Sequence, residues 1–139
     1  MRRERGFNLI ELMIVVVVVA ILAMIAIPSY RRYVVRSHRT EAQRALLDLA
    51  GREERYFYAN NAYAPSVSAL GGASTAEGGN YLLSIDPAVS ASTDYVITAT
   101  AIGTQQRDDQ DCQTLSINRA GARSATGAAS SASTICWGQ

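Results

Sequence analysis

The sequence contains no lysine, one histidine, two cysteines and three prolines among its 139 residues. A structural zinc site needs four ligands, and the chain offers His38, Cys112 and Cys136 without any CxxC spacing. A Ser-His-Asp set cannot be argued from a single histidine just outside an apolar segment. Gly78-Gly79 is not followed by the Lys-Ser/Thr pair of a phosphate-binding loop. These absences predict a chain with no catalytic residues, no metal and no cofactor.

Positive and negative charges nearly balance, with thirteen arginines against twelve acidic residues. Residues 1–6 hold three of the arginines and one glutamate, so the remainder has ten arginines against eleven acids, a net charge of −1. Binding of nucleic acid through bulk electrostatics requires a concentrated basic surface. Nucleic acid is therefore not an expected partner.

Both cysteines, Cys112 and Cys136, lie in the last quarter of the chain. Because the other ligands of a metal site are missing, the pair favours a disulfide over two free thiols. Such a bond would close a loop of about 25 residues, which is worth about 3–4 kcal/mol in the chain-entropy model. Disulfides persist in oxidising compartments. The pair therefore predicts that this end of the chain lies outside the cytoplasm.

The longest apolar run, LIELMIVVVVVAILAMIAI, extends from Leu9 to Ile27 and contains one charge, Glu11. Its nineteen residues approach the roughly 20 that cross a bilayer core as a helix, in which the backbone satisfies its own hydrogen bonds. The run is long for a secretory signal peptide, and no small-x-small cleavage site follows it. We therefore expect a membrane-spanning helix that is retained in the protein.

Glu11 is unusual because a carboxylate in a membrane-spanning helix costs about 2.5–3.5 kcal/mol on insertion scales. One interpretation places it near enough to the interface to stay hydrated. In the other interpretation, a cation pairs with the carboxylate only later, when subunits assemble. Arginines flank the apolar run on both sides, so the positive-inside comparison is ambiguous. The predicted disulfide then sets the orientation, with the N-terminus in the cytoplasm.

The segment Gly6-Phe7-Asn8-Leu9-Ile10-Glu11 lies between a short arginine-rich leader and a long apolar helix that contains Pro28. This arrangement resembles the N-terminal signature of type IV pilins and of type II secretion pseudopilins. The resemblance implies that a prepilin peptidase cleaves between Gly6 and Phe7, and that Phe7 becomes N-methylated. It further implies that Glu11 is an assembly contact, which neutralises the N-terminal amine of a neighbouring subunit, and that Pro28 bends the helix.

A single helix is predicted from Phe7 to Tyr58, since Asn60-Asn61 and Pro65 end it. Its second half carries an apolar stripe at helical spacing that should pack on the rest of the domain: Ala42, Ala45, Leu46, Leu49 and Tyr56. The opposite face is expected to be solvated and rich in ion pairs: Glu41, Arg44, Asp48, Arg52, Glu53 and Glu54.

Three strands are predicted after the helix, at Tyr81–Ile85, Tyr95–Ile102 and Cys112–Ile117. Their short spacing favours an antiparallel sheet packed on the apolar stripe. Residues 119–134, rich in small and hydroxyl side chains, are expected to be irregular. The expected fold class is α+β. The resemblance implies the type IV pilin fold, a long N-terminal helix packed on a small antiparallel sheet with a disulfide-closed C-terminal loop.

The expected organisation has three parts. Residues 1–6 form a leader peptide, and residues 7–29 form the transmembrane and assembly half of the helix. Residues 30–139 form a periplasmic globular domain that includes the second half of the helix.

Two charged clusters are given structural interpretations. Residues 108–111 (Asp-Asp-Gln-Asp) lack the Gly and distal Glu of an EF-hand loop, so a solvated turn is expected rather than a calcium site. Arg32, Arg36 and Arg39 share a helix face. This set could contact DNA or lipid head groups, but pairing with acidic residues of an adjacent subunit is favoured.

The predicted function is therefore structural: a type IV pilus subunit that is held in the inner membrane and then incorporated into the pilus on the cell surface. Its expected partners are other pilin subunits, the prepilin peptidase, the inner membrane and the pilus assembly machinery. Residues 36–43 and 52–56 resemble, more loosely, the PilE minor pilins, which favours a minor pilin needed for pilus assembly, twitching motility and adhesion. Two alternatives are a type II secretion pseudopilin and a DNA-uptake (competence) pilin.

Overall fold

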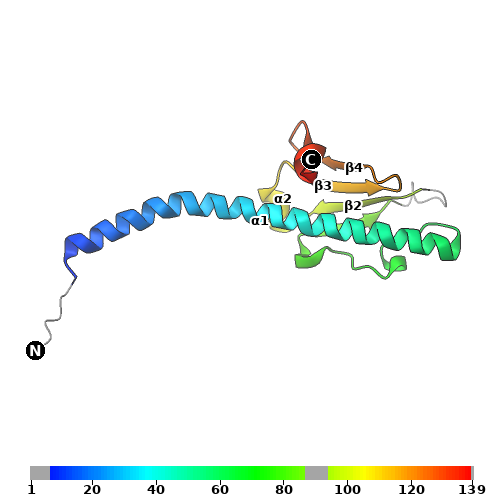
Figure 1. The fold of residues 1–139 in the computed structure, drawn as a ribbon, viewed down its shortest axis with the longest axis horizontal. Coiled ribbons are helices and arrows are strands. Elements are labelled where there is room, and N and C mark those ends of the chain that lie inside the picture. Colours follow the sequence, from blue (N-terminus) through cyan, green and yellow to red (C-terminus); the bar gives the residue numbers. More distant parts are fainter. Residues whose placement is uncertain (1–6, 87–93, 139) are drawn as a thin grey trace, which may run out of the picture. The chain divides into compact units, whose positions relative to one another are not determined.

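The computed structural model describes residues 7–86 and 94–138, and these residues divide into two compact units. The first unit ends at Val34 and the second begins at Val35. Figure 1 shows the helices and strands of both units in sequence colours. Each unit is described by itself below.

The first unit is helical and contains the beginning of helix α1 (Leu9–Asn60). The predicted limits of this helix, Phe7 and Tyr58, were each two residues too early. Every large apolar side chain from Phe7 to Ile27 is 48–79% exposed. Among the described residues, α1 is long and apolar enough to cross a membrane, with a mean hydropathy of 3.2 in its most apolar window. A surface of this kind is stable only when lipid or other protein covers it.

The second unit packs the later part of α1 against a four-stranded antiparallel sheet, which lies alongside the helix in Figure 1. The strands lie in sequence order: β1 (Tyr81–Ile85), β2 (Val96–Ala101), β3 (Thr114–Asn118) and β4 (Arg123–Thr126). The alternation of the strands buries one face and leaves mostly Ser and Thr side chains, together with Leu82, on the other. The expected α+β fold, with its sheet packed on a long helix, is confirmed.

The apolar stripe of α1 is confirmed at three of its five positions, because Ala42, Leu46 and Leu49 are buried. Ala45 is partly buried and packs against this core, whereas Tyr56 is only half-buried. The stripe faces the buried side chains of the sheet: Tyr81, Leu83, Ile85, Ile97, Ala99, Ala101, Leu115 and Ile117.

Three elements were not predicted: helix α2 (Gly103–Asp108), strand β4 and helix α3 (Ala132–Trp137). The expectation of an irregular 119–134 segment was therefore wrong. Strand β4 forms from Arg-Ser-Ala-Thr, which has little intrinsic strand preference, because β3 supplies its hydrogen-bonding partner. Helices α2 and α3 are six residues long, too short to form without tertiary support. Two single 3₁₀ turns, η1 (Ser68–Leu70) and η2 (Glu77–Gly79), lie between α1 and β1.

The predicted disulfide between Cys112 and Cys136 is confirmed. It links the residues just before β3 to helix α3, with a Cα–Cα distance of 5.7 Å. Both cysteines are buried within the core cluster. The bond therefore holds the C-terminal segment, with the buried Trp137, against the sheet.

Candidate assembly site

The residues predicted to act in processing and assembly lie at the start of the first unit. Phe7 precedes α1 and its side chain is 79% exposed, while Gly6 falls outside the described residues. Glu11 is exposed in the first turn of α1. A carboxylate at this position interacts favourably with the free N–H groups and the dipole of the helix. The assembly role of Glu11, like peptidase cleavage and methylation at Phe7, stays a prediction.

Pro28 lies inside α1, and helical structure is assigned on both sides of it. A proline within a helix removes one backbone hydrogen bond and clashes with the preceding turn. The backbone hydrogen bonding of the helix is therefore weaker around Pro28. The bend at this residue remains a prediction.

The apolar side chains of the first unit form a continuous surface without a protein partner among the described residues. Fully burying one Val, Leu, Ile or Met side chain is worth about 1.5–3 kcal/mol. Because these side chains are exposed on all sides of the helix, the segment needs an apolar environment, which lipid or the same segment of another copy can provide. This surface can therefore anchor the chain and join copies.

The second unit is held together by a buried polar network that sequence reasoning did not find. Arg39 on α1 donates two hydrogen bonds to Asp109, Nε to Oδ2 at 2.6 Å and Nη2 to Oδ1 at 2.5 Å. The Gln105 amide nitrogen donates to Asp109 at 2.9 Å and to the Tyr81 hydroxyl at 3.1 Å. His38 Nδ1 lies 2.9 Å from Gln105 Oε1, which makes the histidine the donor because the amide oxygen can only accept. The network joins α1, β1 and α2.

Two members of this network, Arg39 and Tyr81, have raised pKa values. The hydrogen bond to Asp109 raises the pKa of Arg39 above its ordinary value. Burial raises the pKa of Tyr81 to about 12, so its phenol stays protonated. The arrangement positions α2 against α1 and β1.

Two charge assignments made from the sequence are wrong. Arg32, Arg36 and Arg39 were predicted to pair together with acidic residues of an adjacent subunit. Arg39 instead pairs with Asp109 of its own chain, whereas Arg32 and Arg36 are exposed. Asp109 is 2% exposed and does not belong to a solvated turn. The partners lie 70 positions apart in sequence, and no local pattern reports such a pairing.

Glu53 was predicted on the solvated face of α1, and the structure contradicts this because the residue is fully buried. Its Oε2 accepts a hydrogen bond of 2.9 Å from the Ala64 backbone N–H, and its Oε1 has no hydrogen-bond partner among the described residues. Burial raises its pKa above the ordinary glutamate value. The spacing to Leu46 and Leu49 was the available signal, since Glu53 continues their stripe.

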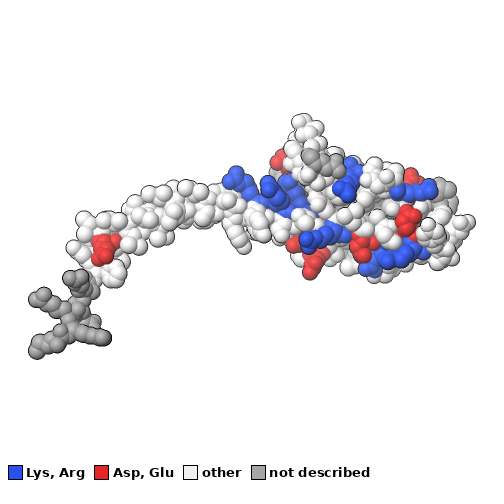
Figure 2. Space-filling view, viewed as in Figure 1, with Lys and Arg blue, Asp and Glu red and all other residues white. Residues whose placement is uncertain are grey.

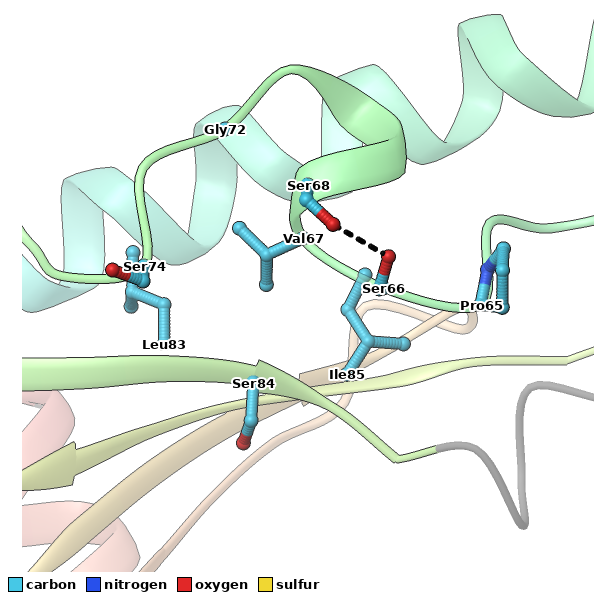
Figure 3. A pocket seen from close by; sticks show the side chains of 9 residues that line it. All are labelled: Pro65, Ser66, Val67, Ser68, Gly72, Ser74, Leu83, Ser84 and Ile85. Carbon is cyan, nitrogen blue, oxygen red and sulfur yellow. Dashed lines mark hydrogen bonds between the residues drawn. The ribbon is translucent and has the colours of Figure 1, made fainter.

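An uncharged groove of about 330 Å³ lies between strand β1 and the chain that follows α1 (Figure 3). Its lining combines apolar side chains with serines: Pro65, Ser66, Val67, Ser68, Gly72, Ser74, Leu83, Ser84 and Ile85. None of these side chains carries a charge. Across the described ranges, no group of three His, Cys, Asp or Glu side chains is placed to hold a metal ion.

Arginine side chains gather along α1 on the face shown in Figure 2. In the second unit, Arg36, Arg44 and Arg55 are exposed. Their guanidinium groups have no ion pair or hydrogen bond with any described residue. This helix face is therefore available to a negatively charged or polar partner.

Comparison with known proteins agrees with these features. The family described as "Type IV minor pilin ComP, DNA uptake sequence receptor" matches residues 28–116. The "Prokaryotic N-terminal methylation motif" matches residues 1–27. The chain is 39% identical over 100 residues to the fimbrial protein EcpC of Eikenella corrodens, covering 70% of this chain and 62% of EcpC. It is 35% identical over 113 residues to the type IV major fimbrial protein FimA of Dichelobacter nodosus, covering 70% of this chain and 71% of FimA.

Among solved structures, the non-core minor pilin PilV of Neisseria meningitidis has a similar fold, with a TM-score of 0.55. The two sequences are 18% identical, and the match covers 72% of this chain and 94% of the PilV chain. The chain thus spans less than two thirds of EcpC and most of the PilV chain.

Proposed function

This chain belongs to the type IV pilin family, and from that premise we propose that it is a minor subunit of a type IV pilus. As a member of this family it is a structural protein and not an enzyme. The observation that carries the proposal is the N-terminal methylation motif joined to an apolar helix that none of the described residues of the chain covers. A subunit of this design is incomplete until copies associate.

The proposed sequence of events begins with the precursor in the inner membrane and its second unit in the periplasm. The disulfide between Cys112 and Cys136 supports this orientation because it requires an oxidising compartment. Cleavage after Gly6 would leave Phe7 with a methylated, positively charged amine. That amine is the only new cation that processing creates, and Glu11 of a neighbouring copy is its proposed partner. The intact mass of the chain from membranes tests this step: loss of residues 1–6 and gain of one methyl group are expected.

The proposal of a minor rather than a major role rests on the match to a minor-pilin family and on the PilE-like residues 36–43. FimA, by contrast, is named a major fimbrial protein. Quantitative mass spectrometry of sheared pili distinguishes a minor pilin from a major pilin. The chain should make up a small fraction of total pilin, while its deletion should reduce piliation, twitching motility and adhesion. A dominant band in the pilus would identify a major pilin instead.

A second candidate function, DNA uptake, is favoured by one finding, the match over residues 28–116 to a family described as a DNA uptake sequence receptor. The exposed Arg36, Arg44 and Arg55 give a surface that could contact phosphates. The near-neutral net charge opposes bulk binding. A gel-shift titration of the full chain in detergent, against the variant with all three arginines changed to Gln, tests it. Equal and weak shifts for both proteins would reject this candidate.

A further inference from the structure

Four consecutive residues follow the apolar segment after Pro28 and Ser29, and the assembly steps of the proposed function do not use them. These are Tyr30, Arg31, Arg32 and Tyr33, all within the first unit and all exposed. The two tyrosine side chains are 68% and 70% exposed. Neither arginine forms an ion pair or side-chain hydrogen bond with any residue in the described ranges. We call these four residues the interfacial girdle.

The girdle surrounds the helix at one level. Successive residues of an α-helix are rotated by about 100°, so four consecutive side chains point to all sides of it. Cα–Cβ bonds tilt toward the N-terminus of a helix, and these side chains therefore lean back toward the apolar segment. A helix that crosses a bilayer needs interfacial groups around its whole circumference, and the girdle supplies them.

The distance from the apolar segment agrees with the thickness of a lipid head-group layer. Tyr30 and Tyr33 lie three and six residues beyond Ile27, which is about 4.5 and 9 Å along the helix at 1.5 Å per residue. The head-group layer is about 5–7 Å thick on each side of the hydrocarbon core. With side chains directed back toward the core, the rings and guanidinium groups fall within this layer.

The residue types are those that bind at such an interface. Tyrosine places its ring against hydrocarbon and its hydroxyl among head groups. Arginine binds phosphate through two parallel hydrogen bonds. Cations are usually concentrated on the cytoplasmic side of a membrane helix, so two arginines on the opposite side of this one require a separate explanation.

We propose that the girdle, residues Tyr30 to Tyr33, binds the phosphate groups of anionic phospholipids in the periplasmic leaflet and fixes the depth of the membrane-held subunit. This inference rests on the proposed membrane-held precursor and its orientation. It has a consequence for Glu11, which lies 16 residues before Ile27, about 24 Å along the helix. Because the hydrocarbon core is about 30 Å thick, a girdle held in the periplasmic head groups places Glu11 about 6 Å inside the opposite boundary of the core.

The test measures depth in vesicles with a nitroxide attached at Ile25→Cys, in the full chain. The native cysteines are joined in a disulfide and do not react with the label. Ile25 lies near the expected outer boundary of the hydrocarbon, where access of a water-soluble nickel complex relative to oxygen changes steeply with depth. The vesicles contain phosphatidylcholine alone or with phosphatidylglycerol.

Two girdle variants and one matched control separate the contributions. Arg31→Gln with Arg32→Gln should abolish the difference in label depth between the two lipid mixtures. Tyr30→Ala with Tyr33→Ala should shift the label in both mixtures by at least one residue of helix, about 1.5 Å. Arg44→Gln with Arg55→Gln changes two exposed arginines of the same helix in the second unit, and it should leave the depth unchanged.

Three results would overturn the proposal. Unchanged depth in both girdle variants would show that these residues do not position the helix. An equal loss of lipid dependence in the Arg44/Arg55 control would show unspecific attraction to the charged surface. If nickel access to the label in the unaltered chain were the same with and without vesicles, the segment would not be inserted, and this result alone would also contradict the membrane-held precursor. Incorporation into pili is scored separately and does not enter the depth measurement.

Discussion

Replacing Asp109 by alanine is expected to destabilise the second unit by about 3 kcal/mol. The change removes both acceptors of Arg39 and one acceptor of the Gln105 amide. The Asp109 side chain is 1% exposed and that of Arg39 is 15% exposed. Removing one partner of a buried ion pair costs about 3–5 kcal/mol, because the other charge stays unpaired. The residual solvent access of Arg39 places this case at the low end of that range.

The assay is thermal unfolding of the full chain in detergent micelles, followed by the fluorescence of Trp137. This is the only tryptophan of the chain, and it is buried in the second unit. One kcal/mol lowers the melting temperature of a domain near 100 residues by about 4–8 °C. Asp109→Ala should therefore melt about 12–24 °C below the unaltered protein.

A double variant tests the reasoning more sharply than the single change. Arg39→Met combined with Asp109→Leu replaces both charges with apolar groups, which is often neutral or stabilising at a buried site. Most of the lost stability should return. If the two single costs simply added, or if Asp109→Ala cost less than about 1 kcal/mol, the pair would not act as a buried unit.

Three other predictions concern titration and assembly. Because the pKa of Glu53 is raised, the folded state binds more protons than the unfolded state above about pH 4.5. The free energy of unfolding should therefore fall as the pH rises above that value. Glu53→Gln should flatten this slope in pH-dependent melting curves. An unaltered slope would contradict the burial. Burial raises the pKa values of Tyr81 and Tyr95 to about 12 from an ordinary 10, so stability should decline between about pH 10 and 12, and Tyr95→Phe should lessen the decline in alkaline melts. Glu11→Ala should leave the membrane level of the chain unchanged or higher and reduce its co-purification with sheared pili; normal incorporation would show that Glu11 is not an assembly contact.

Local patterns in the sequence were sufficient for the parts of the fold that depend on neighbouring residues. Helix α1 was predicted to within two residues at each end, because apolar content and helix-ending residues are local signals. Strand β1 was predicted with its observed limits for the same reason. The two cysteines could be paired because the chain has no others.

The failures all involve contacts between one element and another part of the fold. Strand β4 is a short, weakly strand-forming segment that becomes a strand by pairing with β3. Glu53 was predicted to be a surface residue, but it is buried and accepts a hydrogen bond from the Ala64 backbone N–H. Helix α2 has one buried residue, Gln105, and its position depends on hydrogen bonds to other elements.

The sequence by itself determined that the chain has an apolar helix needing an external partner, a processing motif and a disulfide-closed α+β domain. These are properties of composition, spacing and periodicity, which exist before the chain folds. Only the tertiary structure decided which charges are buried, because Arg39 and Asp109 meet when α1 and α2 pack together. A side chain's hydration and its partner depend on the whole folded surroundings, and those surroundings form only when residues far apart in sequence come into contact.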